Sequence, residues 1–191
     1  MEALFVSTGL VALAEIGDRT QLLAFLLAAR YRKPGPIILG ILVATIANHA
    51  FAGLIGTWLT ALMEPQALRW VLGVSFIAMA VWIMVPDKLD DADATRTRFG
   101  VFGTTLITFF LAEMGDKTQI ATVALAAQYQ SLIAVVVGTT LGMMIANVPA
   151  IYLGDRFAHR LPVKLIHLIA AAVFFALGVA TLLGAGQGFG F

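Results

Sequence analysis

Six long apolar stretches occupy most of this 191-residue chain, and they constrain its fold more than any other feature. They cover residues 3–29, 36–62, 69–85, 100–127, 132–153 and 165–185. Because a helix of about 20 apolar residues crosses the hydrocarbon core of a bilayer, each stretch is long enough to span a membrane. Charged residues make up 12% of the chain, about half their share in a soluble domain. The sequence therefore predicts an all-α integral membrane protein with six transmembrane helices.

Length and composition exclude several classes of protein. Six spans leave too few residues for an appended catalytic domain, and a formal net charge of +1 provides no basic surface for nucleic acid. The chain has no cysteine, which excludes disulfides and thiolate metal sites. It begins Met1-Glu2-Ala3 without a basic segment, and the first apolar stretch exceeds signal-peptide length. We therefore expect this stretch to be retained.

Lysine and arginine are concentrated in alternate connections between the apolar stretches. Nine lie in the first, third and fifth connections, and one lies on the opposite side. The nine are Arg30, Arg32, Lys33, Lys88, Arg96, Arg98, Arg156, Arg160 and Lys164, and the one is Arg69. The positive-inside rule then predicts a multi-pass protein of the cytoplasmic (inner) membrane, with these three connections in the cytoplasm and both termini outside.

The longest polar connection, residues 86–99, is rich in aspartate. An acidic cation-binding loop is one interpretation, but the segment lacks the glycine and the closing glutamate of a calcium loop. A solvated cytoplasmic linker is therefore the preferred interpretation. The acids concerned are Asp87, Asp90, Asp91 and Asp93.

The two halves of the chain resemble each other. Nine of 17 residues are identical between positions 15–31 and 113–129, an offset of 98. Each half contains three spans, an odd number, so the second half enters the membrane from the opposite side. The sequence thus predicts two inverted three-helix repeats, residues 1–85 and 100–191, joined by the linker 86–99. Inverted repeats are typical of transporters, with the substrate site near the midplane where the repeats meet.

Each repeat places charges in the middle of an apolar span. A charge at the bilayer centre costs about 2.5–3.5 kcal/mol, so these side chains are expected to face the protein interior. The i,i+3 spacing of each Glu/Asp pair predicts that both carboxylates share one helix face, and the duplication brings four together as metal ligands. These acids are Glu15, Asp18, Glu113 and Asp116. The intervening Gly17 and Gly115 predict either a local helix break or a close approach of helices, so that backbone carbonyls can also point into the site.

Neutral side chains near the acids are further candidates for the metal site: Gln21, Gln119, Asn48 and Asn147. The two asparagines are equally suited to bonding across helices. Thr20 and Thr118 are expected to bond to their own backbone carbonyls.

Sulfur and imidazole groups complete the candidate set. The Met114 sulfur would favour manganese, but packing in a helix interface is the preferred interpretation. His49 is a candidate proton relay or pH sensor, although a lone histidine more often bonds a neighbour. His159 and His167 are interpreted as peripheral.

A purely structural alternative is a buried ion-pair network. Arg19 lies four residues after Glu15, and Lys117 lies four after Glu113, so each cation is spaced to neutralise its own glutamate. Four carboxylates and two cations leave two negative charges, which match one divalent ion or two protons. Crowded carboxylates in a low-dielectric site also bind protons. We therefore predict exchange of one divalent cation for about two protons, with all-oxygen ligands favouring calcium, manganese and magnesium over copper or zinc.

The motif Glu-x-Gly-Asp-(Lys/Arg)-Thr, present once in each half, resembles the Gdt family of divalent cation (manganese/calcium):proton exchangers. The resemblance covers essentially the full chain and implies a bacterial manganese exporter, with metal and protons as substrates and no cofactor. By this resemblance the cation-binding acids are Glu15, Asp18, Glu113 and Asp116, followed in the motif by Gln21 and Gln119.

Several other functions stay open at this stage. The cargo could be calcium or another cationic solute, such as cadmium or a cationic amino acid. An intramembrane metalloprotease would need a His-Glu-x-x-His helix, which the chain lacks, and a hydrolase built on Asp18 and Asp116 would not explain the duplication. A scaffold would tolerate replacement of all four acids. We therefore expect a transporter and not an enzyme.

Overall fold

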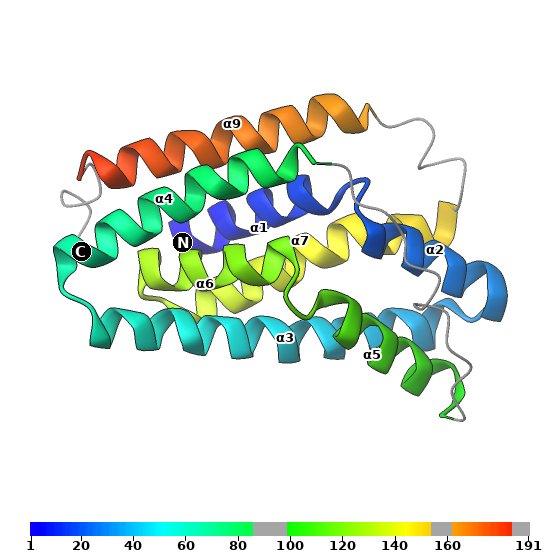
Figure 1. The fold of residues 1–191 in the computed structure, drawn as a ribbon. Helices are drawn as coiled ribbons and strands as arrows, with labels where there is room; N and C mark the ends of the chain where they lie inside the picture. Colours follow the sequence, from blue (N-terminus) through cyan, green and yellow to red (C-terminus); the bar gives the residue numbers. More distant parts are fainter. Residues whose placement is uncertain (86–98, 154–161, 185–191) are drawn as a thin grey trace.

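The computed structural model describes residues 1–85, 99–153 and 162–184, and its regular structure there is all α-helix (Figure 1). The helices are α1 (Glu2–Glu15), α2 (Arg19–Tyr31), α3 (Pro34–Leu62), α4 (Pro65–Ile83), α5 (Gly100–Glu113), α6 (Lys117–Tyr129), α7 (Leu132–Leu153) and α9 (Val163–Leu182). The predicted all-α class is confirmed. Nearly all of the predicted linker 86–99 lies outside the described residues, as do Arg156, His159 and Arg160.

Four of these helices, α3, α4, α7 and α9, are long and apolar enough to cross a membrane. The first and fourth apolar stretches are each divided into two shorter helices, α1 with α2 and α5 with α6. Of the two roles that the sequence suggests for the glycines, a local break is therefore confirmed.

The backbone at the two breaks explains why glycine is needed there. Ile16 and Met114 leave the helical conformation for an extended one, and the next residues, Gly17 and Gly115, have φ of 85° and 79°. A residue with a Cβ in this left-handed region costs about 1–2 kcal/mol. The chain then re-enters a helix after Asp18 and Asp116.

Two apolar clusters hold the helices together. The first comes mainly from α1, α4, α6 and α9, with Phe76 packing against Phe174. The second comes mainly from α2, α3 and α5, including Ile41 and Phe109. Because α1 and α6 belong to one cluster while α2 and α5 belong to the other, both breaks lie where the clusters meet (Figure 1).

The outer surface of the helices is apolar, whereas polar groups lie inside. Trp58, Val74 and Phe175 are exposed, while the carboxylates of the two motifs are buried. In water such an exposed apolar surface would be an aggregation liability, and in a bilayer it is the expected lipid-facing surface. The chain is a helical membrane protein.

Candidate cation site

Helix ends supply the four acids that the sequence singled out. Glu15 and Glu113 are the last residues of α1 and α5, and Asp18 and Asp116 are the N-caps of α2 and α6. All four are at most 3% exposed. The i,i+3 argument was wrong, because the chain is not helical between the two acids of a pair. A turn replaces the helix, with the aspartate N–H donating to the glutamate carbonyl at 3.0 Å in the first half and 3.2 Å in the second.

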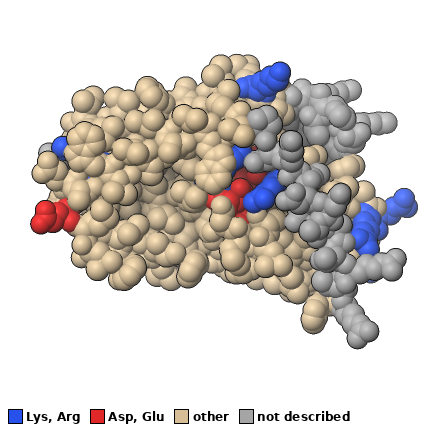
Figure 2. All heavy atoms as spheres, viewed as in Figure 1, with Lys and Arg blue, Asp and Glu red and all other residues tan. Residues whose placement is uncertain are grey.

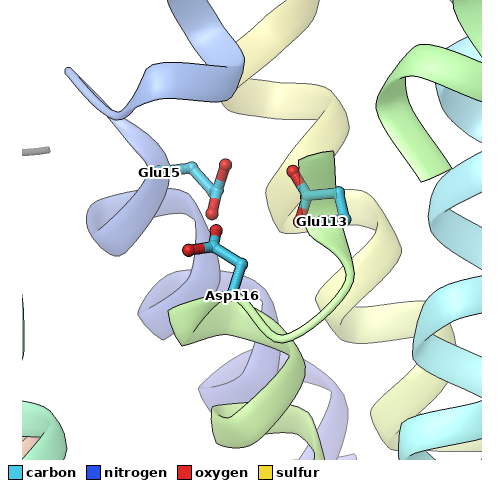
Figure 3. Close-up of side chains that lie close together, drawn as sticks. All are labelled: Glu15, Glu113 and Asp116. Atoms are coloured by element: carbon cyan, nitrogen blue, oxygen red, sulfur yellow. The ribbon is translucent and has the colours of Figure 1, made fainter. Parts of the chain in front are cut away.

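Three of the four carboxylates come together from both halves of the chain. Glu15, Glu113 and Asp116 each offer an oxygen, and these atoms all lie within 4.8 Å of one another. Figure 3 shows the three side chains pointing toward one another from the ends of α1 and α5 and the start of α6. The fourth acid, Asp18, lies outside this trio, and its Oδ1 is 3.7 Å from Lys117 Nζ.

Hydrogen bonds from threonine orient both glutamates. Thr20 Oγ1 donates to Glu15 Oε2 at 2.7 Å, and Thr118 Oγ1 donates to Glu113 Oε2 at 3.2 Å. The expectation that these threonines bond to backbone carbonyls was wrong, because each is the second residue of its helix and has no earlier turn behind it. Glu113 Oε1 is buried and accepts no hydrogen bond from the described residues. This oxygen is available to a ligand.

The two glutamines stabilise the breaks. Gln21 Oε1 accepts from Gly17 N–H at 2.9 Å, and Gln119 Oε1 accepts from Gly115 N–H at 2.7 Å. Gln21 also donates to the carbonyl of Ala146 at 2.8 Å. In this arrangement their oxygens bind the backbone next to the trio of carboxylates.

The two asparagines differ in their contacts. Asn48, on α3, donates to the carbonyl of Phe110 on α5 at 3.1 Å, the cross-helix role that the sequence left open. Asn147 donates to the carbonyl of Met143 within α7 at 3.0 Å. Its Oδ1 is buried without a partner in the described part of the chain. Asn147 therefore offers a neutral oxygen in the interior.

Two ion pairs cross from one half of the chain to the other. Arg19 Nη2 lies 3.3 Å from Asp116 Oδ1 and 2.7 Å from the carbonyl of Ala112. Lys117 pairs with Asp18 and donates to the carbonyl of Val85 at 3.3 Å. The i,i+4 spacing instead suggested pairs within one helix, but the breaks separate each glutamate from the helix that carries the cation. The pairs therefore join the two motifs.

Sequence reasoning missed the role of His167. Its Nε2 lies 2.8 Å from the carbonyl of Ile16, so α9 contacts the first break and the residue is not peripheral. Met114 is 53% exposed, which contradicts its interpretation as a helix-interface residue. His49 is fully buried, and neither of its ring nitrogens has a hydrogen-bond partner among the described residues.

Figure 2 shows acidic and basic side chains together in a small opening between uncharged ones on the face in view. Three carboxylates with Arg19 beside them leave two negative charges, and Asp18 and Lys117 balance each other. Oxygen ligands with this charge suit a hard divalent cation.

Comparison with known protein families gives a match over nearly the whole chain. The model described as "Divalent cation/proton antiporter GDT1" matches residues 3–91 and 101–188. Each matched segment contains one Glu-x-Gly-Asp motif. No solved structure matches the chain.

Individual relatives cover most of the chain as well. A protein of Vibrio cholerae serotype O1 named "Putative manganese exporter" is 52% identical over 182 residues, which are 95% of this chain and 90% of the relative. "GDT1-like protein sll0615" of Synechocystis is 28% identical over 192 residues, 90% of this chain and 92% of the relative. "GDT1-like protein 3" of Oryza sativa is 26% identical, over 94% of this chain and 73% of the relative.

Proposed function

The chain belongs to the divalent cation/proton antiporter GDT1 family, and from this premise we propose that it exports a divalent cation, manganese in the first place, in exchange for protons. Membership confirms the resemblance drawn from the two motifs, and the family is one of transporters and not of enzymes. The preference for manganese is supported by the name of the Vibrio cholerae relative.

The observation that carries the proposal is the trio of buried carboxylates contributed by both halves. One oxygen each of Glu15, Glu113 and Asp116 lies within 4.8 Å of the others in a protein interior, where the two negative charges that remain beside Arg19 are costly. A divalent ion offsets this repulsion, and protons do so when the ion has left. Competition between the two for the same oxygens is the physical basis of exchange.

We assign the remaining predicted ligands to supporting positions. Asp18 joins the trio when its contact with Lys117 opens, and Asn147 supplies a neutral oxygen. Asn48, Gln21 and Gln119 position the backbone around the ion. No cofactor is needed in this scheme, because the metal is cargo.

The same proposal includes the topology. We propose six spans, with α1–α2 and α5–α6 each crossing as a broken helix, arranged as inverted repeats 1–85 and 100–191 with a cytoplasmic linker at 86–99. Support comes from the repeated motif and from the shared glycine break. The distribution of lysine and arginine supports the cytoplasmic membrane with both termini outside.

The test is metal-driven proton flux in proteoliposomes. The purified protein is reconstituted around a trapped pH indicator, and Mn²⁺ or Ca²⁺ is added outside. Wild-type protein is expected to release protons from the lumen in response to Mn²⁺ and more weakly in response to Ca²⁺. Glu113→Gln should lower the flux by at least about tenfold, as loss of a metal-binding group does.

Glu64→Gln is the matched control, because Glu64 is an exposed glutamate at the start of α4, remote from the trio in sequence and fold. Equal flux in Glu113→Gln and wild type would overturn the assignment of the site. Strongly electrogenic exchange would contradict the ratio of one divalent ion to two protons. A larger response to Ca²⁺ would make calcium the cargo, which oxygen ligands also suit.

A further inference from the structure

A second polar site lies at the opposite end of α6 from the carboxylate trio. It is a pocket of about 210 Å³ between the end of α3, the start of α4 and the ends of α6 and α9. The 13 residues of α6 separate it from the motif by about 20 Å at 1.5 Å per residue. None of its lining residues belongs to either motif.

Arg69 gives the pocket its charge. This arginine lines the pocket, and its Nε is buried with no hydrogen-bond partner among the described residues. Within that part of the chain it also has no carboxylate within 4.0 Å. A guanidinium stays charged in proteins, and burying its Nε–H without a partner is costly. The pocket is therefore built to receive an anion.

The other polar groups of the pocket are compatible with an anion. Gln128 Oε1 accepts a hydrogen bond from Thr181 at 3.3 Å, which leaves the amide N–H groups of Gln128 as further donors. None of the described residues that line the pocket is acidic. Those residues offer no carboxylate to the positive charge of a metal ion or of a headgroup ammonium.

Two exposed tryptophans indicate how deep in the membrane the pocket lies. Trp58 on α3 is 63% exposed and Trp70 on α4 is 54% exposed, and each lies within two residues of a residue that lines the pocket. Tryptophan is enriched at the level of the lipid headgroups. Phosphate groups are the anions found at that depth.

We propose that this pocket binds the phosphate group of an anionic phospholipid headgroup, with Arg69 as its main contact and Gln128 as a second donor. Arginine is well suited to phosphate because its planar donors can form two parallel hydrogen bonds. Met63, Leu68 and Leu72, which also line the pocket, provide an apolar wall for the glycerol and upper acyl carbons. The inference does not depend on the transported ion.

The test measures lipid binding to the purified full chain in detergent. Phosphatidylglycerol, phosphatidylcholine and inorganic phosphate are added separately, and the thermal unfolding midpoint and the lipid retained in native mass spectrometry are recorded. Phosphatidylglycerol should raise the midpoint and stay bound. Arg69→Gln should weaken this binding by about tenfold or more, as expected for loss of a charged hydrogen bond.

Arg32→Gln is the matched control, since Arg32 is an exposed arginine next to α2 and outside the pocket. It should bind phosphatidylglycerol like the wild type. If Arg69→Gln fails to fold, Gln128→Leu keeps the charge and removes the second donor, and it should show a smaller loss.

If the wild type and the pocket variants bound phosphatidylglycerol equally well, the proposal would be overturned. It would also be overturned if phosphatidylcholine raised the thermal unfolding midpoint as much as phosphatidylglycerol does. An equal, Arg69-dependent shift with inorganic phosphate alone would identify a site for a free anion and reject the lipid.

Discussion

The break between α1 and α2 and the break between α5 and α6 follow the same backbone path but have different surroundings. In both, an extended residue is followed by a glycine with positive φ, whose N–H is bonded by a glutamine four residues later. At the first break, a Cβ on Gly17 would overlap the Val163 side chain of α9, and His167 contacts the Ile16 carbonyl. At the second, no atom of the described residues lies within 4 Å of a Cβ on Gly115.

The cations differ in the opposite sense. The Lys117 side chain, next to the second break, is 4% exposed, and that of Arg19, next to the first, is 27% exposed. The duplicated sequence therefore fixes the local backbone, whereas the surrounding helices give the two breaks different environments.

The largest expected difference concerns the two cations. Lys117→Met removes the ion pair with Asp18, whose two side chains are 4% and 3% exposed, and should lower the free energy of unfolding by about 3–5 kcal/mol. Arg19→Met should cost only about 1 kcal/mol, because the Arg19 side chain is 27% exposed. Unfolding in mixed micelles measures both. Adding Asp18→Asn to Lys117→Met should restore most of the loss, and equal costs for the two cations would remove the distinction between the halves.

A smaller difference is expected at the glycines. Gly115→Ala should cost about 1–2 kcal/mol, the penalty for a positive φ alone. Gly17→Ala carries the same penalty and adds the overlap with Val163, worth about 1–3 kcal/mol. Thermal unfolding compares the two variants. Adding Val163→Ala to Gly17→Ala should raise the stability of Gly17→Ala to that of Gly115→Ala. If stability does not rise, α9 does not restrict the first break.

The glutamines should show a still smaller difference. Gln21→Leu removes two hydrogen bonds, to Gly17 and Ala146, and should cost about 2 kcal/mol, whereas Gln119→Leu removes the bond to Gly115 and should cost about 1 kcal/mol. Gln66→Leu on the exposed start of α4 is the control and should change stability by less than about 0.5 kcal/mol. A larger loss at Gln119 would reverse the expected order.

His167 should give the smallest effect. His167→Phe removes the contact with the Ile16 carbonyl and should cost about 1 kcal/mol, with faster hydrogen exchange at the first break than at the second. His167→Gln retains a donor and should behave more like the wild type. If hydrogen exchange became faster by the same amount at both breaks, α9 would not act on the first break alone.

The sequence predicted which residues form the site better than it predicted which of them contact one another. Glycine in the middle of an apolar span correctly indicated the breaks, and the repeat indicated that acids of both halves meet. The arguments from helix spacing failed because they assume a continuous helix between Glu15 and Arg19, which the break itself removes. Helical periodicity carries no information across such a break.

The contact of His167 with the first break was beyond sequence reasoning for another reason. It joins positions 151 residues apart, and nothing in the composition near Val163 distinguishes it from other apolar helix starts. The motif in the second half does not indicate such a contact either, because no described residue lies within 4 Å of a Cβ on the corresponding Gly115. Differences between duplicated segments arise from the packing of elements outside the duplicated motif.

The hydrogen bonds that Gln21 and Gln119 accept from the glycine N–H groups have a mechanical consequence. Each hydrogen bond joins the bend to the helix that follows it, so we expect the angle between α1 and α2, and that between α5 and α6, to stay fixed. Each pair of helices then rotates as one rigid unit. We therefore expect motion between the halves to occur at the contacts between them, above all where Arg19 meets Asp116 and Lys117 meets Asp18.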